Sequence, residues 1–310
     1  MLWAPALVAA CAAEPATSTQ EAESLWHWPP DNCPEGCGDN AASVGDGLVF
    51  HRLDQRGEPN GVGLRLVGMR AAGMDWDVEV TGDRLSGVRP SARLSGGRLV
   101  GAELLLLDKD GVIHTVVIAG VRLIPYWVGG GETWTYRLMH RPVASPSDLQ
   151  PLCTTRDEAL QDDPGWEGMN ATETVIFTGD HYDAIRKTVE PQPFGWFNIA
   201  CAGSAMAKLH LLRHTEASSD PVHRTDFGER QSMFKMITAD VCGTGRPFTS
   251  DGERLFYMDA HEWTRFDPAN ARSLEAIWNR HGAVCLDEPR RLAEEGPDLL
   301  QLISDECERA

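Results

Sequence analysis

Alternating apolar and polar positions dominate residues 46–145 and predict a run of antiparallel strands. In residues 133–140, for example, Trp134, Tyr136 and Leu138 fall on one face of a strand, and the intervening residues fall on the other. One face of each strand is therefore expected to be buried. The strands expected in this part of the chain are 48–53, 63–69, 76–80, 99–107, 112–123 and 133–140.

Glycines separate these strands at short intervals, as in folds that are built from many tight turns. The segment Asp108-Lys109-Asp110-Gly111 lies between two apolar runs and predicts a β-hairpin turn. A calcium-binding loop would need a bidentate acid at its twelfth position, and the sequence has none there. The pattern therefore predicts an antiparallel β sandwich or a barrel-like domain over residues 46–145.

Residues 146–310 predict a second domain of mixed α/β structure, and a polar stretch at 144–164 marks the junction. Its main expected elements are a strand at 172–178, a helix that runs from about Cys201 after an apolar approach, and a helix at 229–240. The whole chain is thus expected to be α+β. Further elements expected here are a strand at 254–258, a helical turn or two at 273–279 and a terminal helix at 292–306.

The first eleven residues resemble the end of a bacterial lipoprotein signal, because an apolar run ends in Val8-Ala9-Ala10-Cys11. Cys11 would then be acylated and tether the protein to a membrane. No Lys or Arg precedes the run, so the alternative is an incidental cysteine. Residues 12–45 are rich in Pro, Ser, Thr and Glu and lack periodicity, which predicts a flexible spacer. The expected location is extracytoplasmic: anchored at the outer membrane or cell surface, or secreted.

Composition narrows the choice of partners. The chain has 310 residues, a formal net charge of -18 and a sequence pI of about 4.9. A nucleic-acid partner is excluded, because binding to phosphates requires a basic surface. Adhesion to anionic lipid headgroups is disfavoured for the same reason. With 42% hydrophobic and 24% charged residues, the chain has the composition of a folded globular protein.

The cysteine pattern predicts disulfides, as is usual in exported proteins. Cys33 and Cys37 could close a local loop, or they could form half of a zinc site, although no second ligand pair follows them. Without Cys11, seven cysteines remain, so one is left free or pairs between chains. The candidates for structural disulfides are Cys33, Cys37, Cys153, Cys201, Cys242, Cys285 and Cys307, and the sequence leaves their pairing open.

One cysteine is also a candidate nucleophile. Cys201 precedes a predicted helix, whose N-terminal dipole would lower the pKa of a thiol, as in papain-like peptidases. The general base would then be His223, His261 or His281. The alternative is that Cys201 is one half of a disulfide with Cys242, Cys153 or Cys285.

Metal and cofactor motifs are absent from the sequence. His210 and His214 are four residues apart, as in zinc-binding helices, but Leu211 occupies the position of the glutamate that zinc peptidases use as base. We therefore interpret them as surface histidines. The sequence has no phosphate-binding loop, no dinucleotide fingerprint and no nucleophile elbow, so we expect neither a metal nor a cofactor.

Residues Ala239-Asp240-Val241-Cys242 resemble the Ala-Asp-Tyr-Cys signature of the ADYC domain family, with Val241 in place of the tyrosine. Two further segments resemble the family, Phe197–Cys201 and Gly282–Leu286. The resemblance implies an exported or lipoprotein-like bacterial protein of a kind common in myxobacteria. It implies no particular reaction. From the residues themselves, Asp240 is expected to pin the turn that follows its helix.

Together these observations predict an exported lipoprotein that acts as a non-enzymatic surface or periplasmic binding or structural module. Its anchor would be lipid, and its partner would be a protein or a glycan. The alternative function is a thiol-dependent hydrolase of cell-wall or peptide substrates that uses Cys201 and one of the three histidines named above.

Overall fold

A computed structural model describes residues 20–23, 43–44, 48–49, 51–127, 130–142, 145, 147–153, 169–170, 172–183, 186–219, 224–238, 240, 254–257 and 276–286. Contacts divide the chain into two compact units. The unit that we call the sheet unit comprises Pro34–His181 and Glu190–Asp220. The unit that we call the motif unit comprises Met1–Cys33, Tyr182–Val189 and Pro221–Ala310, and it contains the signature segment.

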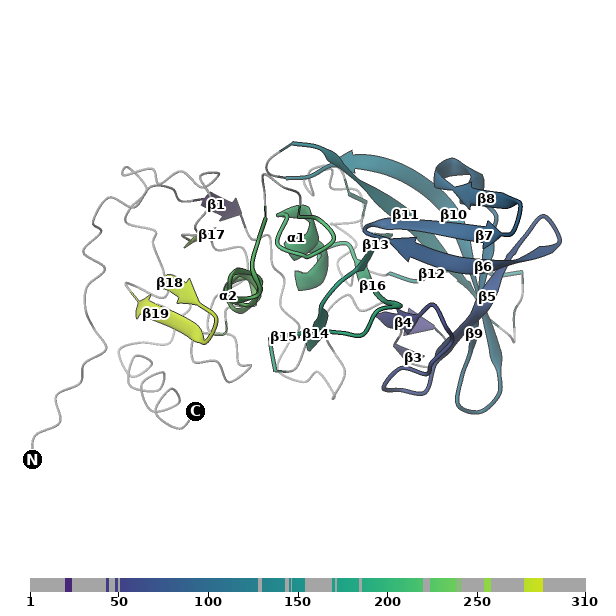
Figure 1. Ribbon diagram of the computed structural model, residues 1–310, viewed down its shortest axis with the longest axis horizontal. Helices are drawn as coiled ribbons and strands as arrows, with labels where there is room; N and C mark the ends of the chain where they lie inside the picture. The colour runs from purple at the N-terminus through teal and green to yellow at the C-terminus, as the bar shows by residue number, and fades with distance from the viewer. Residues whose placement is uncertain are drawn as a thin grey trace, which may run out of the picture. The chain divides into compact units, whose positions relative to one another are not determined.

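The sheet unit contains the largest sheet in the described part of the chain, with 11 strands (Figure 1). Its order is β4-β16-β13-β11-β10-β9-β5-β6-β7-β8, with β12 paired to β11, and each of these pairings is antiparallel. The strands are β4 (Arg52–Asp54), β5 (Arg65–Ala71), β6 (Met74–Thr81), β7 (Arg84–Arg89), β8 (Ala92–Ser95), β9 (Glu103–Leu107), β10 (Ile113–Pro125), β11 (Glu132–Arg141), β12 (Gln150–Pro151), β13 (Glu173–Thr178) and β16 (Trp196–Cys201).

The core of the sheet unit follows from the alternation in the sequence. Leu104, Leu106 and Val116 point to the same side of β9 and β10 as Tyr136 and Leu138 of β11, and all five are buried in one apolar cluster. Each such side chain contributes about 1.5–3 kcal/mol when it leaves water. The predicted Asp108–Gly111 turn is confirmed between β9 and β10, where Gly111 has a φ of 82° and donates to the Asp108 carbonyl.

The sheet curls back on itself. The amide of Thr178, at the end of β13, donates to the carbonyl of Gly82 in the β6–β7 turn at 2.8 Å. The phenol of Tyr136 on β11 accepts from the amide of Leu85 on β7 at 2.9 Å. These bonds join β13 and β11 to the β6–β7 hairpin, which lies toward the other end of the strand order, so the sheet itself encloses its apolar face.

The sheet extends past the domain junction that the sequence predicts near residue 146. β13 pairs with β11, and β16 pairs with both β13 and β4. Residues on both sides of the polar stretch therefore share one core, which a local change in composition cannot reveal. The predicted α+β class is confirmed in its coarse form, as mostly antiparallel sheet with two helices in the described residues.

The two described helices differ from their predicted bounds. The helix predicted from Cys201 begins later, as α1 (Ala205–Leu211), because Phe197–Cys201 continue β16 and Ser204 caps the helix. The helix predicted at 229–240 is α2 (Phe227–Ile237). It begins with a reciprocal capping box between Asp226 and Glu229, whose two hydrogen bonds measure 2.6 and 2.9 Å.

Several short elements complete the description. The helical turn predicted at 273–279 is wrong, because this segment forms β18 (Ala276–Asn279) and pairs with β19 (Gly282–Leu286). The sequence also misses β7 and β8, and residues 96–99 form a 3-10 turn, η1 (Gly96–Leu99), before β9. The remaining strands are β1 (Gln20–Glu23), β2 (Ser43–Val44), β3 (Leu48–Val49), β14 (His181–Asp183), β15 (Thr188–Glu190) and β17 (Arg254–Tyr257). The terminal helix predicted at 292–306 lies outside the described residues.

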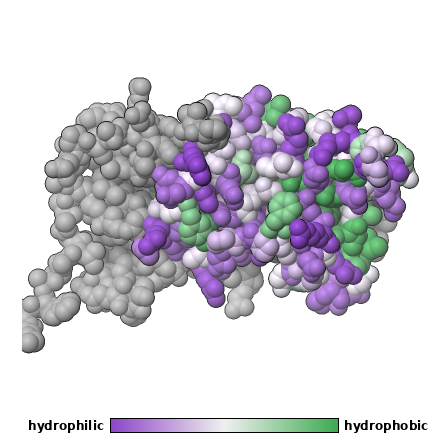
Figure 2. Space-filling model, in the orientation of Figure 1, coloured by the Kyte–Doolittle hydropathy of each residue, from purple (hydrophilic) through white to green (hydrophobic). Residues whose placement is uncertain are grey.

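The described surface in Figure 2 is largely hydrophilic, in keeping with the net charge of -18. Apolar side chains nevertheless reach the solvent on the sheet unit. Ile113 is 54% exposed and Val67 is 49% exposed, and Phe194, between β15 and β16, is 87% exposed. Large aromatic side chains are usually buried, so the exposed ring of Phe194 marks an apolar place on a largely hydrophilic surface.

Candidate functional site

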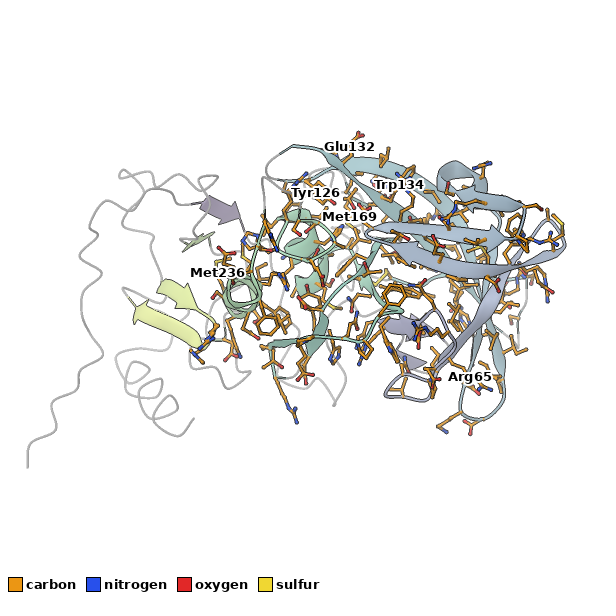
Figure 3. The ribbon with its side chains drawn as sticks, viewed as in Figure 1. Arg65, Tyr126, Glu132, Trp134, Met169 and Met236 are labelled. Atoms are coloured by element: carbon orange, nitrogen blue, oxygen red, sulfur yellow. A yellow bond between two sulfur atoms is a disulfide. The ribbon has the colours of Figure 1, made fainter. Side chains whose placement is uncertain are left out.

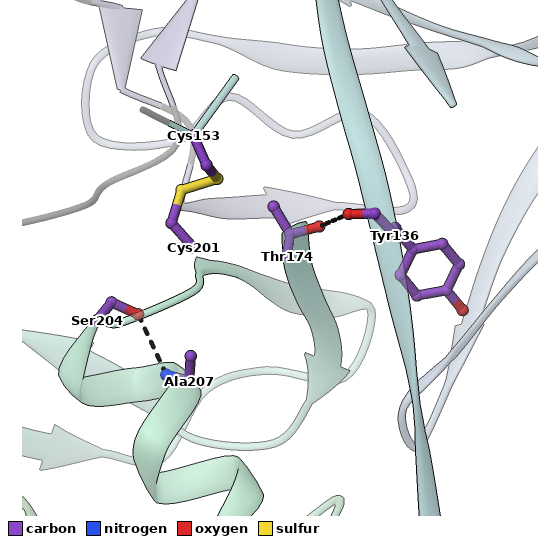
Figure 4. Close-up of a disulfide and its surroundings, with 6 residues drawn as sticks. All are labelled: Tyr136, Cys153, Thr174, Cys201, Ser204 and Ala207. Atoms are coloured by element: carbon purple, nitrogen blue, oxygen red, sulfur yellow. Dashed lines mark hydrogen bonds between the residues drawn. A yellow bond between two sulfur atoms is a disulfide. The ribbon is translucent and has the colours of Figure 1, made fainter. Parts of the chain in front are cut away.

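A buried disulfide joins two segments of the sheet unit (Figure 4). Cys153 follows β12 and Cys201 ends β16, and their Cα atoms are 5.5 Å apart across 48 residues of sequence. Both residues are 1% exposed and belong to the apolar core. This pairing is one of the three that the sequence left open for Cys201.

The disulfide bears directly on the hydrolase hypothesis. Cys201 lies three residues ahead of Ser204, whose hydroxyl accepts from the amide of Ala207 and caps α1 (Figure 4). The predicted place of Cys201 before a helix is thus correct, but its sulfur is bonded to Cys153 and carries no thiol. Papain-like chemistry needs a thiolate, so the bond removes the nucleophile that this hypothesis requires.

The histidines proposed as bases give the hypothesis no support. His223 and His261 lie outside the described residues. His281 lies in the turn between β18 and β19, is exposed, and accepts from the guanidinium of Arg280 at 3.0 Å. Of the other cysteines proposed for disulfides, Cys33, Cys37, Cys242 and Cys307 lie outside the described residues, and only the backbone of Cys285 in β19 is described. The proposed lipidation site, Cys11, also lies outside the described residues.

The signature aspartate occupies a buried place in the motif unit. Asp240 is fully buried, and its carboxylate forms an ion pair with the ammonium group of Lys235, which is itself 4% exposed at its side chain. The backbone amide of Asp240 also donates to the carbonyl of Lys235 at 2.9 Å. The ion pair with Lys235 therefore holds the carboxylate of Asp240 against the C-terminal end of α2. The other signature residues, Ala239, Val241 and Cys242, lie outside the described residues.

The same face of α2 holds the turn between β14 and β15. The side-chain amide of Gln231 accepts from the amide of Val189 at 2.7 Å and donates to the carbonyl of Lys187 at 2.9 Å. One turn further along the helix, Lys235 donates to the carbonyl of Arg186 at 3.1 Å. Gln231 and Lys235 thus satisfy three backbone groups of one turn.

We call this arrangement the α2 clamp: Gln231, Lys235 and Asp240 with the Arg186–Val189 turn. The sequence predicts that Asp240 pins the turn that follows its helix, and the structure shows its carboxylate paired with Lys235; the sequence does not point to Gln231 or Lys235. The available signal was their spacing of four residues, which places two polar side chains on the same face of a helix. All polar atoms of the clamp that we describe serve backbone groups or one another, which is the pattern of a structural network.

A second buried polar network surrounds α1 in the sheet unit. His210 and His214 are both fully buried, so our interpretation of them as surface histidines is wrong. The physical reason is that nearly all of α1 is enclosed, and only a hydrogen-bonded imidazole is tolerated there. His210 contacts Thr133 through Nε2 and Thr215 through Nδ1, each at 2.9 Å.

Two aromatic rings lie against the imidazole of His210. Phe177 of β13 stacks on it with ring centres 4.6 Å apart, and Tyr126 lies 5.7 Å away at the end of β10 (Figure 3). Arg213 lies over the Tyr126 ring at 4.4 Å and donates to the carbonyl of Gly130 at 2.6 Å. Gly131 makes room for this contact, since a Cβ there would lie 2.6 Å from the Arg213 guanidinium.

Burial sets the electrostatics of this network. It lowers the pKa of His210 from 6.5 to about 3, and the positive charge of Arg213 adds to the effect. Burial also raises the pKa of Tyr126, with the carboxylate of Asp83 contributing. His210 is therefore a neutral hydrogen-bonding bridge at physiological pH. A base with such a low pKa and no exposed surface is poorly suited to proton transfer with a substrate.

Two further observations limit the chemistry of the described residues. Among them, no three or more His, Cys, Asp or Glu side chains converge on a place for a metal ion. None of the helices described here is both long and apolar enough to cross a bilayer.

Comparison with known proteins identifies one family. A family model described as the ADYC domain matches residues 96–292, which is well over half of the chain. The match begins within the sheet unit and includes α1, the disulfide, α2 and the signature aspartate. No curated protein and no solved structure matches the chain.

Removal of the disulfide should destabilise the sheet unit strongly. The closed loop spans 48 residues, and the loss of such a crosslink is expected to reduce the free energy of unfolding by about 4 kcal/mol, through the entropy of the unfolded chain. Urea unfolding of a Cys153→Ala/Cys201→Ala double variant measures this. Each single variant should be no more stable than the double variant. An unchanged midpoint in the double variant would contradict a structural role.

The α2 clamp should respond to the loss of either charge. Lys235→Met leaves Asp240 buried without its cation, and Asp240→Leu leaves Lys235 without its anion, so each should lose about 3–5 kcal/mol of unfolding free energy. The double variant should lose clearly less than the sum, as measured in a urea double-mutant cycle. The exposed pair of Arg93 and Glu79 is the matched control, and Arg93→Met should have little effect. Strict additivity at Lys235 and Asp240 would refute the coupling.

The pKa of His210 predicts how stability depends on pH. The unfolded chain binds a proton at this residue near pH 6.5, whereas the folded chain resists it down to about pH 3. Between these values the unfolded state holds more protons, so acidification should lower the unfolding free energy by up to about 1.4 kcal/mol per pH unit. His210→Gln should be less stable at pH 7 but should show a shallower fall from pH 6.5 to pH 4.5. Identical slopes in urea titrations would show that His210 does not contribute.

Proposed function

This chain belongs to the ADYC domain family, and on that premise we propose that it is an extracytoplasmic, lipid-anchored binding or structural module without catalytic activity. The β-rich part of the chain would form a barrel-like body. The motif unit would be held together by the α2 clamp and by disulfides among the remaining cysteines. The partner would be a protein or a glycan, and the acidic surface speaks against nucleic acid.

The observation that carries the proposal is the Cys153–Cys201 disulfide. A bond between two core cysteines that are 1% exposed is a permanent crosslink, since reductants have no path to it in the folded protein. Such bonds form and persist in oxidising compartments and are rare in the cytosol. The Cys153–Cys201 disulfide therefore supports a location outside the cytoplasm.

The proposal that the protein lacks catalytic activity is supported by the structural contacts of its described polar groups. Asp240 is paired with Lys235, His210 bridges two threonines, and Cys201 is bonded to Cys153. Enzymes keep such groups exposed in a cleft and poised to react. In this protein the groups lie in the interior and complete the structure, so we do not advance the hydrolase hypothesis.

A role in binding is supported by an exposed aromatic surface on the sheet unit. Phe194 is 87% exposed, and the guanidinium of Arg56 lies 5.5 Å from its ring centre. Nearby, Arg52 stacks 4.2 Å above the ring of Trp196. Aromatic and arginine side chains dominate the energetics of protein interfaces, and aromatic rings also stack on sugars.

The anchor in this proposal is Cys11, which follows Val8-Ala9-Ala10 and precedes the spacer at residues 12–45. The spacer would keep the folded units away from the bilayer. A diacyl anchor gives stable attachment, because a single chain alone binds a membrane only marginally.

Metabolic labelling tests the anchor. When the full chain is expressed in cells supplied with an alkyne fatty acid, the wild-type protein should become labelled. The Cys11→Ala variant should carry no label and should no longer be found in the membrane fraction. Cys33→Ala and Cys37→Ala are the matched controls, because they remove nearby cysteines without touching the acylation signal. Equal labelling of the wild type and Cys11→Ala would refute the anchor. Recovery of the wild type in the cytosol would refute the location as well.

A further inference from the structure

Two histidines of the sheet unit lie next to each other at the edge of its core. His140 on β11 pairs with Val116 on β10, and His114 lies two residues before Val116, on the same side of the sheet. Their ring centres are 5.9 Å apart. His114 is 8% exposed and His140 is 5% exposed, so both imidazoles are withdrawn from bulk water.

Asp108 fixes the orientation of His114. Its carboxylate lies 2.9 Å from His114 Nε2 and also accepts from the backbone amides of Asp110 and Val112 in the β9–β10 turn. The hydrogen bond to His114 lowers the pKa of Asp108, so the carboxylate is ionised and can only accept. A neutral His114 that donates to this carboxylate has its proton on Nε2 and its lone pair on Nδ1.

One nitrogen on each ring has no hydrogen-bonding partner. These atoms are His114 Nδ1 and His140 Nε2, and both are buried. Most buried polar atoms in native proteins are satisfied, and two exceptions on neighbouring rings call for an occupant or a functional reason. Two such nitrogens on neighbouring rings make one shared occupant the simplest explanation.

We propose that His114 Nδ1 and His140 Nε2 bind a divalent transition-metal ion such as Cu²⁺ or Zn²⁺, with water in the remaining coordination positions. Two imidazoles that bind one ion through single nitrogens have ring centres about 5–6 Å apart, since each metal–nitrogen bond is about 2.0–2.1 Å, and the observed separation of 5.9 Å falls in this range. The site is independent of the proposed anchor and partner.

The surroundings of the two rings suit such an ion. A ligating histidine commonly donates its second N–H to a carboxylate, which orients the ring and increases its basicity, and Asp108 does this for His114. A metal ion binds the neutral form of each imidazole through a ring nitrogen that carries no proton. Only two protein ligands take part, so the ion should be exchangeable, and Cu²⁺ should bind most tightly among the common divalent ions.

The test is a titration of the full chain, with its disulfides intact, with Cu²⁺ in the presence of glycine as a competing chelator of weak surface sites. We expect one Cu²⁺ per chain by calorimetry, and an electron paramagnetic resonance spectrum with splitting from two nitrogens. His114→Gln and His140→Gln should each weaken binding by at least tenfold and remove one nitrogen from the splitting. Asp108→Asn should weaken it by about 10–100-fold while both nitrogens remain.

The matched control is His281→Gln, which removes an exposed histidine of the motif unit and should bind Cu²⁺ as the wild type does. Circular dichroism identifies any variant that fails to fold, and His140→Gln alone then decides, since it leaves the Asp108–His114 pair intact. The proposal is overturned if the wild type binds no Cu²⁺ under competition. It is equally overturned if folded His140→Gln retains wild-type affinity and splitting, because the ion would then lie elsewhere.

Discussion

The structure of the sheet unit depends on the pairing of β16 with both β13 and β4. This strand enters the sheet between β13 and β4 although it lies far along the chain from β4, and five of its six residues are buried. Its last residue forms the disulfide to Cys153, and the next residues turn into α1. One long-range strand pairing thus positions the crosslink, the buried helix and the enclosed face of the sheet. Loop-closure entropy opposes such a pairing, and the disulfide offsets part of it.

The α2 clamp and the hydrogen bonds of His210 share one property: their polar groups complete backbone or side-chain hydrogen bonding inside the protein. The α2 clamp ties a turn to a helix, and His210 ties α1 to β11 through Thr133. Networks of this kind favour a unique arrangement when every member is satisfied. The signature aspartate of the family therefore has a physical explanation as an architectural residue. The His114–His140 pair differs from these networks because each ring retains an unsatisfied nitrogen.

The local sequence pattern predicts the strands whose residues alternate clearly and the tight turns between them. Strands with clear alternation, such as 76–80 and 133–140, and the turn at Asp108–Gly111 are found close to their predicted places. The apolar run of β16 carries no period, so the sequence predicts only an approach to a helix there, and its neighbouring strands make it a strand. Likewise, β13 pairs with β11 across the junction predicted near residue 146, and composition does not encode that pairing.

In the candidate sites, too, the sequence predicts local features but not the contacts that depend on the tertiary structure. The position of Asp240 at the end of its helix followed from the sequence, but its cation did not, because a lysine on an amphipathic helix is normally solvated. His210 and His214 were misplaced because their spacing says nothing about which face is enclosed. His114 and His140 were missed because their juxtaposition needs the register between β10 and β11. Side-chain chemistry that depends on tertiary register lies beyond what a single sequence can provide.

The proposed function requires a crosslinked interior in an oxidising compartment, and peptide mapping under non-reducing conditions tests this requirement most directly. The full chain would be isolated from the cells that produce it, with free thiols alkylated before lysis, and then digested and analysed by mass spectrometry. We expect the peptides containing Cys153 and Cys201 to be recovered as one linked species, without alkylation at either residue. Recovery of both cysteines as alkylated, separate peptides would contradict the account.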